Sequence, residues 1–116
     1  MKRDSRVYID DILEALQKIE TYTAGLDFSA FAQDSKTIDA TVRNFEIIGE
    51  AARKIPEETR NMYKQVPWKT MSGMRDKLIH EYFGVNIDVL WATIQEDLPP
   101  LKPVMNQVLK ELNERQ

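Results

Sequence analysis

One stretch of the chain, MSGMRDKLIHEYFG at residues 71–84, holds the residue types best suited to phosphate chemistry. Arg75, His80 and Tyr82 form the pattern R-x4-H-x-Y, and His80 is the single histidine among the 116 residues. Arginine carries a permanent positive charge in a forked geometry that matches phosphate oxygens. Histidine changes its protonation state near neutral pH and can therefore take or give a proton. The pattern indicates chemistry at a phosphate group.

The same residues also fit a purely structural role. In that interpretation His80 is exposed near the end of a helix and Tyr82 packs on the core. Arg75 then pairs with a neighbouring carboxylate, Asp76 or Glu81. Most charged residues on a helix surface simply face solvent. The spacing alone leaves both interpretations open, so the rest of the chain has to decide between them.

Apolar residues recur at spacings of three and four along most of the chain, which is the period of amphipathic helices. The segment 27–33 is either a short helix or an ordered loop, and no strand pattern appears. The other expected helices cover residues 5–24, 35–55, 56–64 and 68–82, with further helices before and after residues 99–103. The pattern predicts an all-α fold, an up-and-down bundle of four to six helices in a single domain over residues 1–116.

Residues with capping preferences mark the ends of these helices. Asp34 is a good N-cap for the helix at 35–55, and Asn86 or Asp88 for the helix that follows. Gly25 and Gly84 are expected to end helices. Three prolines are expected to interrupt or kink the last helical stretch: Pro99, Pro100 and Pro103.

A straight helix over residues 68–82 would not aim the three motif side chains at one point. Arg75 and Tyr82 are seven residues apart and nearly aligned, whereas His80 lies about 140° round from Arg75 at 100° per residue. Either the helix loosens near His80, or groups from another element or another chain complete the site.

The helix at 35–55 carries a polar side at Glu46, Glu50 and Arg53. This side is either a solvated face or a polar interface with a second subunit or with the helix that carries the motif. Several small residues around it would let another helix approach closely: Ala40, Gly49, Ala51 and Ala52.

Composition excludes several kinds of protein. With no cysteine and one histidine, the chain has no disulfides, no thiolate zinc site and no histidine-rich metal site, and we expect no metal and no cofactor. No segment has the length of an apolar membrane span, and the charged start MKRDSR lacks the apolar core of a signal peptide. We therefore expect a cytoplasmic protein with no membrane partner.

The net charge of −3 argues against a general nucleic-acid binder, and no DNA partner is expected. The charge is nevertheless uneven, because basic residues gather around the motif: Arg60, Lys64, Lys69, Arg75 and Lys77. Such a local patch suits a short segment of phosphate backbone.

Three segments together resemble a known family: IDDILEALQKIE, then TVRNFEIIGEAARKIP, then VPWKTMSGMRDKLIHEYFGVNIDVLWATIQEDLPPLKP. In this order they are similar to HEPN-domain toxins of the HepT type over nearly the whole chain. The resemblance implies a HEPN helical bundle that forms a homodimer and acts as a metal-independent endoribonuclease. It also implies a type VII-like toxin-antitoxin pair, in which the antitoxin is a small nucleotidyltransferase of the MNT type.

The resemblance assigns roles to the motif residues. Arg75 and His80 correspond to the catalytic pair, and Tyr82 to the tyrosine on which the antitoxin places AMP. Asp76 fits the polar residue that follows the arginine in the family, and we expect Lys69 and Lys77 to contact RNA. In an alternative interpretation the chain is a catalytically silent partner subunit of the nucleotidyltransferase, with Trp91 and the C-terminal helix as its docking surface.

Overall fold

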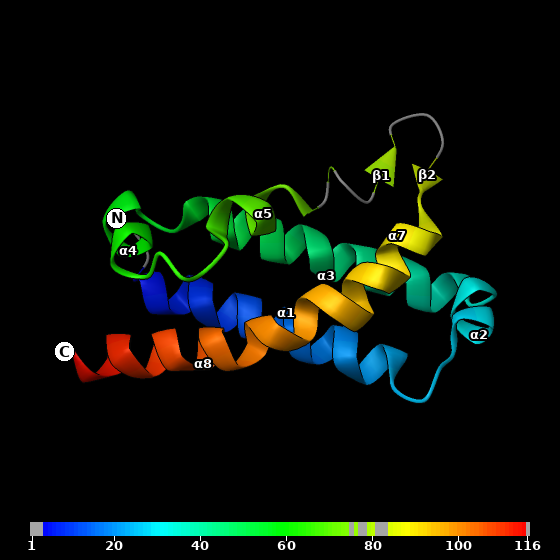
Figure 1. Cartoon of the computed structure of the whole chain (residues 1–116), viewed down its shortest axis with the longest axis horizontal. Helices are drawn as coiled ribbons and strands as arrows, with labels where there is room; N and C mark the ends of the chain where they lie inside the picture. The colour runs from blue at the N-terminus through cyan, green and yellow to red at the C-terminus, as the bar shows by residue number, and fades with distance from the viewer. Residues whose placement is uncertain (1–3, 75, 77–78, 81–83, 116) are drawn as a thin grey trace.

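A computed structural model describes residues 4–74, 76, 79–80 and 84–115. Three long helices form its frame: α1 (Ser5–Thr23), α3 (Ser35–Lys54) and α8 (Leu98–Glu114). Helix α1 packs against both of the others, and Figure 1 shows the three running side by side along the long axis. The shorter helices are α2 (Phe28–Ala32), α4 (Glu57–Met62), α5 (Trp68–Ser72) and α7 (Ile87–Ala92). The predicted all-α bundle is confirmed.

Contacts at the helix ends show that neighbouring long helices run in opposite directions. Arg6 Nη1 donates a 3.2 Å hydrogen bond to Asn113 Oδ1, which joins the start of α1 to the end of α8. The hydroxyl groups of Ser5 and Thr59 lie 3.3 Å apart and join the start of α1 to α4, which follows α3. This is the up-and-down arrangement that the short connections predict.

The core lies where the apolar stripes of α1, α3 and α8 meet. Fully buried side chains come from all three helices: Ile9, Ile12, Ile19, Phe45, Ile48, Met105 and Val108. Each such side chain stabilises the fold by about 1.5–3 kcal/mol relative to leaving it exposed. No helix in the described part of the chain combines the length and apolar character needed to cross a membrane.

The predicted N-caps of α3 and α7 are confirmed, and so is the glycine that follows α1. The Asp34 carboxylate accepts a 3.0 Å hydrogen bond from the backbone N–H of Thr37 at the start of α3. Of the two candidates for α7, Asn86 is the cap, and its side-chain oxygen accepts a 3.1 Å bond from the N–H of Val89. Gly25 follows α1 with φ +78°, a conformation that favours glycine. The segment 27–33, for which the sequence allowed either a short helix or an ordered loop, contains the short helix α2.

The prolines do not interrupt the last helical stretch. Helix α7 continues through a π-helical segment, η1 (Thr93–Asp97), into α8, so residues 87–114 form one helical run. Pro99 and Pro100 lie in the first turn of α8, where a missing N–H costs little, and Pro103 lies inside the helix. In the π-helical segment directly before them, the backbone hydrogen bonds span five residues and not the four of an α-helix.

The prediction of a continuous helix over residues 68–82 is wrong. Helix α5 ends at Ser72 and Gly73 forms a turn, because glycine is a weak helix former. Further on, β1 (Ile79–His80) pairs antiparallel with β2 (Gly84–Val85). Gly84 belongs to β2 and does not end a helix, and its φ is +73°. A pair of two-residue strands is too short to leave an alternating pattern in the sequence.

Candidate functional site

The R-x4-H-x-Y motif lies in the connection between α5 and α7. The backbone of His80 belongs to β1, opposite Gly84 on β2, and Asp76 is helical and exposed. Arg75, Lys77 and Tyr82 lie outside the described residues, and so does the side chain of His80. The grouping of these side chains stays a prediction.

The sequence allows the motif side chains to come together in two ways: the helix loosens near His80, or another element or chain completes the site. The backbone supports the first of them. His80 lies in a strand, so the helical period no longer fixes the angle between it and Arg75. The opposing residue, Gly84, has a positive φ and allows the chain to turn back there. On a straight helix, His80 would lie about 140° round from Arg75 at 100° per residue. The helix does loosen near His80, which is the first of the two alternatives.

Helix α5 is the platform from which the motif begins, and buried side chains fix it. Met71 and Met74 lie in the core, and the Trp68 ring is 6% exposed. The Trp68 Nε1–H donates a 3.0 Å hydrogen bond to the carbonyl oxygen of Tyr63, which satisfies the indole group inside the protein. These contacts hold the first turn of α5 against the bundle.

Helix α3 lies directly behind this platform, and Gly49 makes the close approach possible. A Cβ atom at Gly49 would lie 3.3 Å from the carbonyl oxygen of Ser72 and 3.4 Å from that of Met71. Both neighbours are backbone atoms and cannot rotate away. The small residues of α3 therefore serve the close helix contact that the sequence predicts.

The three residues on the polar side of α3 have different partners, so the side is partly a solvated face and partly a polar contact. Arg53 Nη2 donates a 3.1 Å hydrogen bond to the carbonyl oxygen of Ser72, so this residue contacts the segment that carries the motif. Glu50 instead pairs with Lys54 at 3.2 Å, and Glu46 with Arg43 at 3.7 Å. Arg53 therefore supports a contact between the polar side of α3 and the segment that leads to the motif, and the described residues do not test a second subunit.

Basic residues before the motif surround a shallow cavity of about 480 Å³ at the junction of α4 and α5. Arg60 comes from α4, Lys64 from the turn that follows, and Lys69 from the first turn of α5. The sequence predicted a local basic patch but not a cavity. Because these cations come from two helices, only the fold could show that they share one depression.

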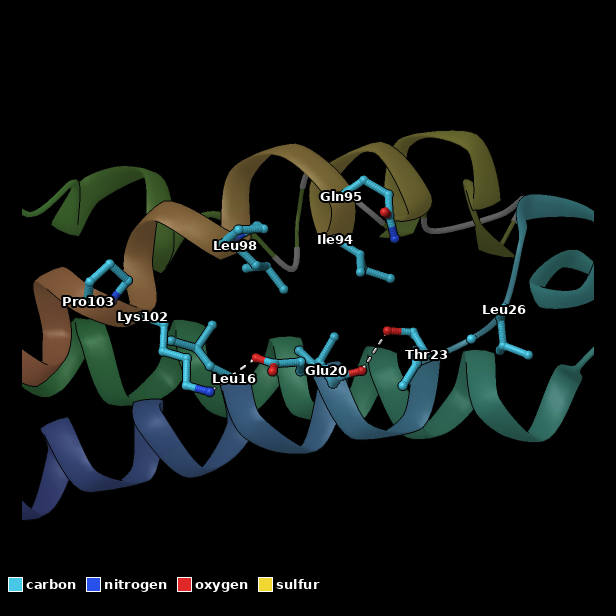
Figure 2. A pocket seen from close by; sticks show the side chains of 13 residues that line it. Leu16, Glu20, Thr23, Leu26, Ile94, Gln95, Leu98, Lys102 and Pro103 are labelled. Carbon is cyan, nitrogen blue, oxygen red and sulfur yellow. Dashed lines mark hydrogen bonds and ion pairs between the residues drawn. The ribbon is translucent and has the colours of Figure 1, made fainter.

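Another cavity, of about 560 Å³, lies between α1 and the η1–α8 segment. Figure 2 shows apolar side chains such as Leu16, Ile94 and Leu98 facing it. Lys102 Nζ lies 3.2 Å from Glu20 Oε2 on one side, and this ion pair already satisfies both charges. The described residues that line this cavity include none of the motif.

Trp91 packs within its own subunit. Its ring lies 5.0 Å from the Phe31 ring and 6.3 Å from the Phe28 ring, between centroids. This contact joins α7 to α2 and accounts for the partial burial of the indole. Trp91 therefore has a structural role without any docked partner.

Metal ligands do not gather in the described ranges. Among those residues, no group of three or more histidine, cysteine, aspartate or glutamate side chains could hold a metal ion.

Comparison with known proteins agrees with the resemblance of the sequence. Residues 12–108 match the family described as Ribonuclease HepT-like. A probable ribonuclease HepT of Thermococcus cleftensis is 46% identical over 110 residues, which is 95% of this chain and 100% of that protein. A candidate RNase of Methanocaldococcus jannaschii is 40% identical over 111 residues, which is 96% of this chain and 92% of that protein.

A third relative, a candidate RNase of Caldanaerobacter subterraneus subsp. tengcongensis, is 42% identical over 106 residues. The match covers 91% of this chain and 95% of that protein. No solved structure matches the chain. Because the family match spans both the helical frame and the whole R-x4-H-x-Y motif, the chain belongs to the HepT-like ribonuclease family.

Proposed function

We propose that this protein is a metal-independent endoribonuclease in which Arg75 and His80 cut RNA. The observation that carries the proposal is the family match over residues 12–108, which includes every residue of the motif. The names of the relatives support the same class of activity, since each name describes a ribonuclease. The loosened backbone at His80 also supports it, because a straight helix would separate His80 from Arg75.

The chemistry follows from the residue types. A base removes the proton of the RNA 2′-hydroxyl, whose oxygen then attacks the adjacent phosphorus. The bond to the 5′-oxygen breaks, and an acid protonates this leaving group. The products are a 2′,3′-cyclic phosphate and a free 5′-hydroxyl. His80 supplies one of the two proton transfers, and Arg75 stabilises the negative charge that develops on the phosphoryl oxygens.

Residues near the pair have supporting roles in this proposal. Asp76, which is exposed next to Arg75 in the sequence, belongs to the polar part of the motif. Lys69 and Lys77 contact the RNA backbone, and Lys69 is exposed on α5 as this role requires. These contacts orient the strand and do not take part in proton transfer.

One histidine cannot act as base and acid in the same step. We therefore propose a homodimer in which a two-fold axis brings two copies of Arg75 and His80 to one cleft. His80 of one subunit is the base, and the second His80, Tyr82 or water supplies the proton. Mixed dimers that contain one His80→Ala chain should cut more slowly than the wild type, and an unchanged rate would contradict the shared cleft.

The proposed partner is an MNT-type nucleotidyltransferase that acts as the antitoxin by transferring AMP to Tyr82. A bulky anionic group at this position would block RNA sterically and occupy Arg75. The modification would inactivate the enzyme without unfolding it.

The decisive experiment is cleavage of a mixed RNA pool in EDTA by the wild type and by His80→Ala. A Lys36→Ala variant, changed at an exposed residue of α3, serves as the matched control. Wild type and control should leave cyclic-phosphate ends, and His80→Ala should lose at least about 100-fold in rate. Absence of cleavage by protein whose mass shows no AMP would favour the silent partner subunit. Equal cleavage by His80→Ala would reveal a contaminant.

A further inference from the structure

We propose that the basic cavity at the α4–α5 junction binds a backbone phosphate of the RNA, at a distance from the phosphate that is cut. The proposal rests on the proposed function and adds a second anchoring point to it. Its cationic residues are Arg60, Lys64 and Lys69, which line the same depression.

The first argument is the uncompensated charge of this cavity. Elsewhere in the described part of the chain, several basic side chains form ion pairs with carboxylates, as Lys18 does with Glu14 and Lys102 with Glu20. No ion pair among the described residues includes any of the three cavity cations. Among the described residues of the lining, Glu57 is the one acidic residue. The balance of charge in the depression is therefore positive, which favours an anion.

Arg60 gives a second argument. Its Nε atom is buried and has no hydrogen-bond partner among the residues that the structure describes. A buried donor without a partner is costly, and a guanidinium next to a phosphate gains strong, charge-assisted hydrogen bonds. A phosphate in this cavity would supply acceptors and negative charge to the half-buried guanidinium.

The lining suits a nucleotide better than an isolated ion. Asn61 and Thr70 are exposed members of the lining and provide polar groups for sugar hydroxyls. Trp68 and Val66 are buried and form the floor together with Pro67. The depression is rigid on one side because Thr59 of α4 contacts Ser5 of α1.

The position of the cavity relates it to the motif. Lys69 in the first turn of α5 lines it, and the same helix leads towards Met74 and then to β1. Figure 1 shows α5 lying between α4 on one side and the β1–β2 pair on the other. An RNA strand held in the cavity and cut at the motif therefore runs along α5, so the cavity binds a phosphate other than the scissile one.

The test measures how RNA affinity depends on salt. The probe is a single-stranded oligonucleotide with 2′-O-methyl groups, which cannot undergo attack by its own 2′-oxygen. Each phosphate contact to a single strand contributes about 0.7 to the slope of log K against log salt concentration. Because one phosphate occupies the cavity, the variant Arg60→Gln/Lys64→Gln/Lys69→Gln should lower the magnitude of this slope by about 0.7.

A matched control carries the same change of net charge elsewhere. Lys36→Gln/Lys110→Gln/Arg115→Gln alters three exposed residues outside the cavity, and its slope should equal that of the wild type. The double variant Lys64→Gln/Lys69→Gln keeps the half-buried Arg60 in place, and the magnitude of its slope should fall by up to about 0.7. This variant tests the proposal even if the change at Arg60 impairs folding.

The possible results separate the two proposals. If the wild type cuts RNA in EDTA but the cavity and control variants have the same slope, the anchoring point is wrong and the nuclease stands. If the wild type neither cuts RNA nor binds the oligonucleotide, the nuclease and the anchoring point both fail. A slope lowered only in the cavity variants supports the anchoring point.

Discussion

Arg53 on α3 donates a hydrogen bond of 3.1 Å from Nη2 to the main-chain carbonyl oxygen of Ser72, the last residue of α5. The last carbonyls of a helix have no partner within the helix, and a cation is favourable next to them. The bond therefore joins the central bundle to the point from which the chain leaves for the R-x4-H-x-Y motif. Arg53 is a positioning residue in the proposed enzyme.

The change Arg53→Met should lower the rate of RNA cleavage by about tenfold, because small displacements at a reacting centre are costly. The free energy of unfolding should fall by no more than about 1 kcal/mol, since one hydrogen bond is lost. Cleavage assays and urea denaturation measure the two effects. Lys54→Met is the control, because it breaks only the exposed pair with Glu50. Equal cleavage rates for the two variants would contradict a positioning role.

The change Gly49→Val should destabilise the fold by about 1–3 kcal/mol, the usual cost of overpacking. Its side chain would press on the carbonyl oxygens of Ser72 and Met71, and α5 would have to move. The matched change Gly73→Val meets its nearest atom, the carbonyl oxygen of Lys69, at 3.6 Å and should cost less. Urea denaturation of both variants measures the difference. A smaller loss at Gly49 than at Gly73 would show that α5 is not held against α3.

The cap of α3 should make stability depend on acid pH. Hydrogen bonds from the hydroxyl and the backbone N–H of Thr37 hold the pKa of the Asp34 carboxyl below its ordinary value of 3.8. Because the folded state lowers this pKa, the carboxylate stabilises the fold fully above pH 3.8. The contribution is lost as the pH falls through the lower pKa of the folded state.

Two variants isolate this contribution. Asp34→Ala should lower the urea midpoint at pH 7, whereas Asp34→Asn keeps a capping oxygen and should stay close to the wild type. As the pH falls below 3.8, the wild type should lose stability relative to Asp34→Asn. Urea midpoints measured at several pH values give both differences, and a constant difference across acid pH would refute the argument.

The proposed AMP acceptor can be tested with the nucleotidyltransferase and labelled ATP. Tyr82→Phe protein should take up no label and should escape inhibition, because it lacks the phenolic oxygen that attacks the nucleotide. Tyr22→Phe is the matched control, since Tyr22 is 40% exposed on α1 and should leave labelling unchanged. Full labelling of the Tyr82→Phe protein would place the modification elsewhere.

The helical frame could be predicted from the sequence because its signals are local. The apolar spacing of residues such as Ile12 and Phe45 decides which face of a helix is buried, and both side chains are 1% exposed or less. The side-chain oxygens of Asp34 and Asn86 act on backbone groups three residues away, so they mark helix starts without any tertiary context. The motif itself, with Arg75 and His80, is also a property of the sequence alone.

What only the tertiary structure decided depends on contacts between distant segments. The helix expected over residues 68–82 gives way to a strand at Ile79 because the backbone there pairs with Val85, and a local period cannot report such pairing. Arg53 contacts the motif helix only because Gly49 lets α5 approach. Likewise, Arg60 and Lys69 share a cavity only because α4 and α5 meet. Spacing in the sequence determines faces of helices, and packing determines which faces meet.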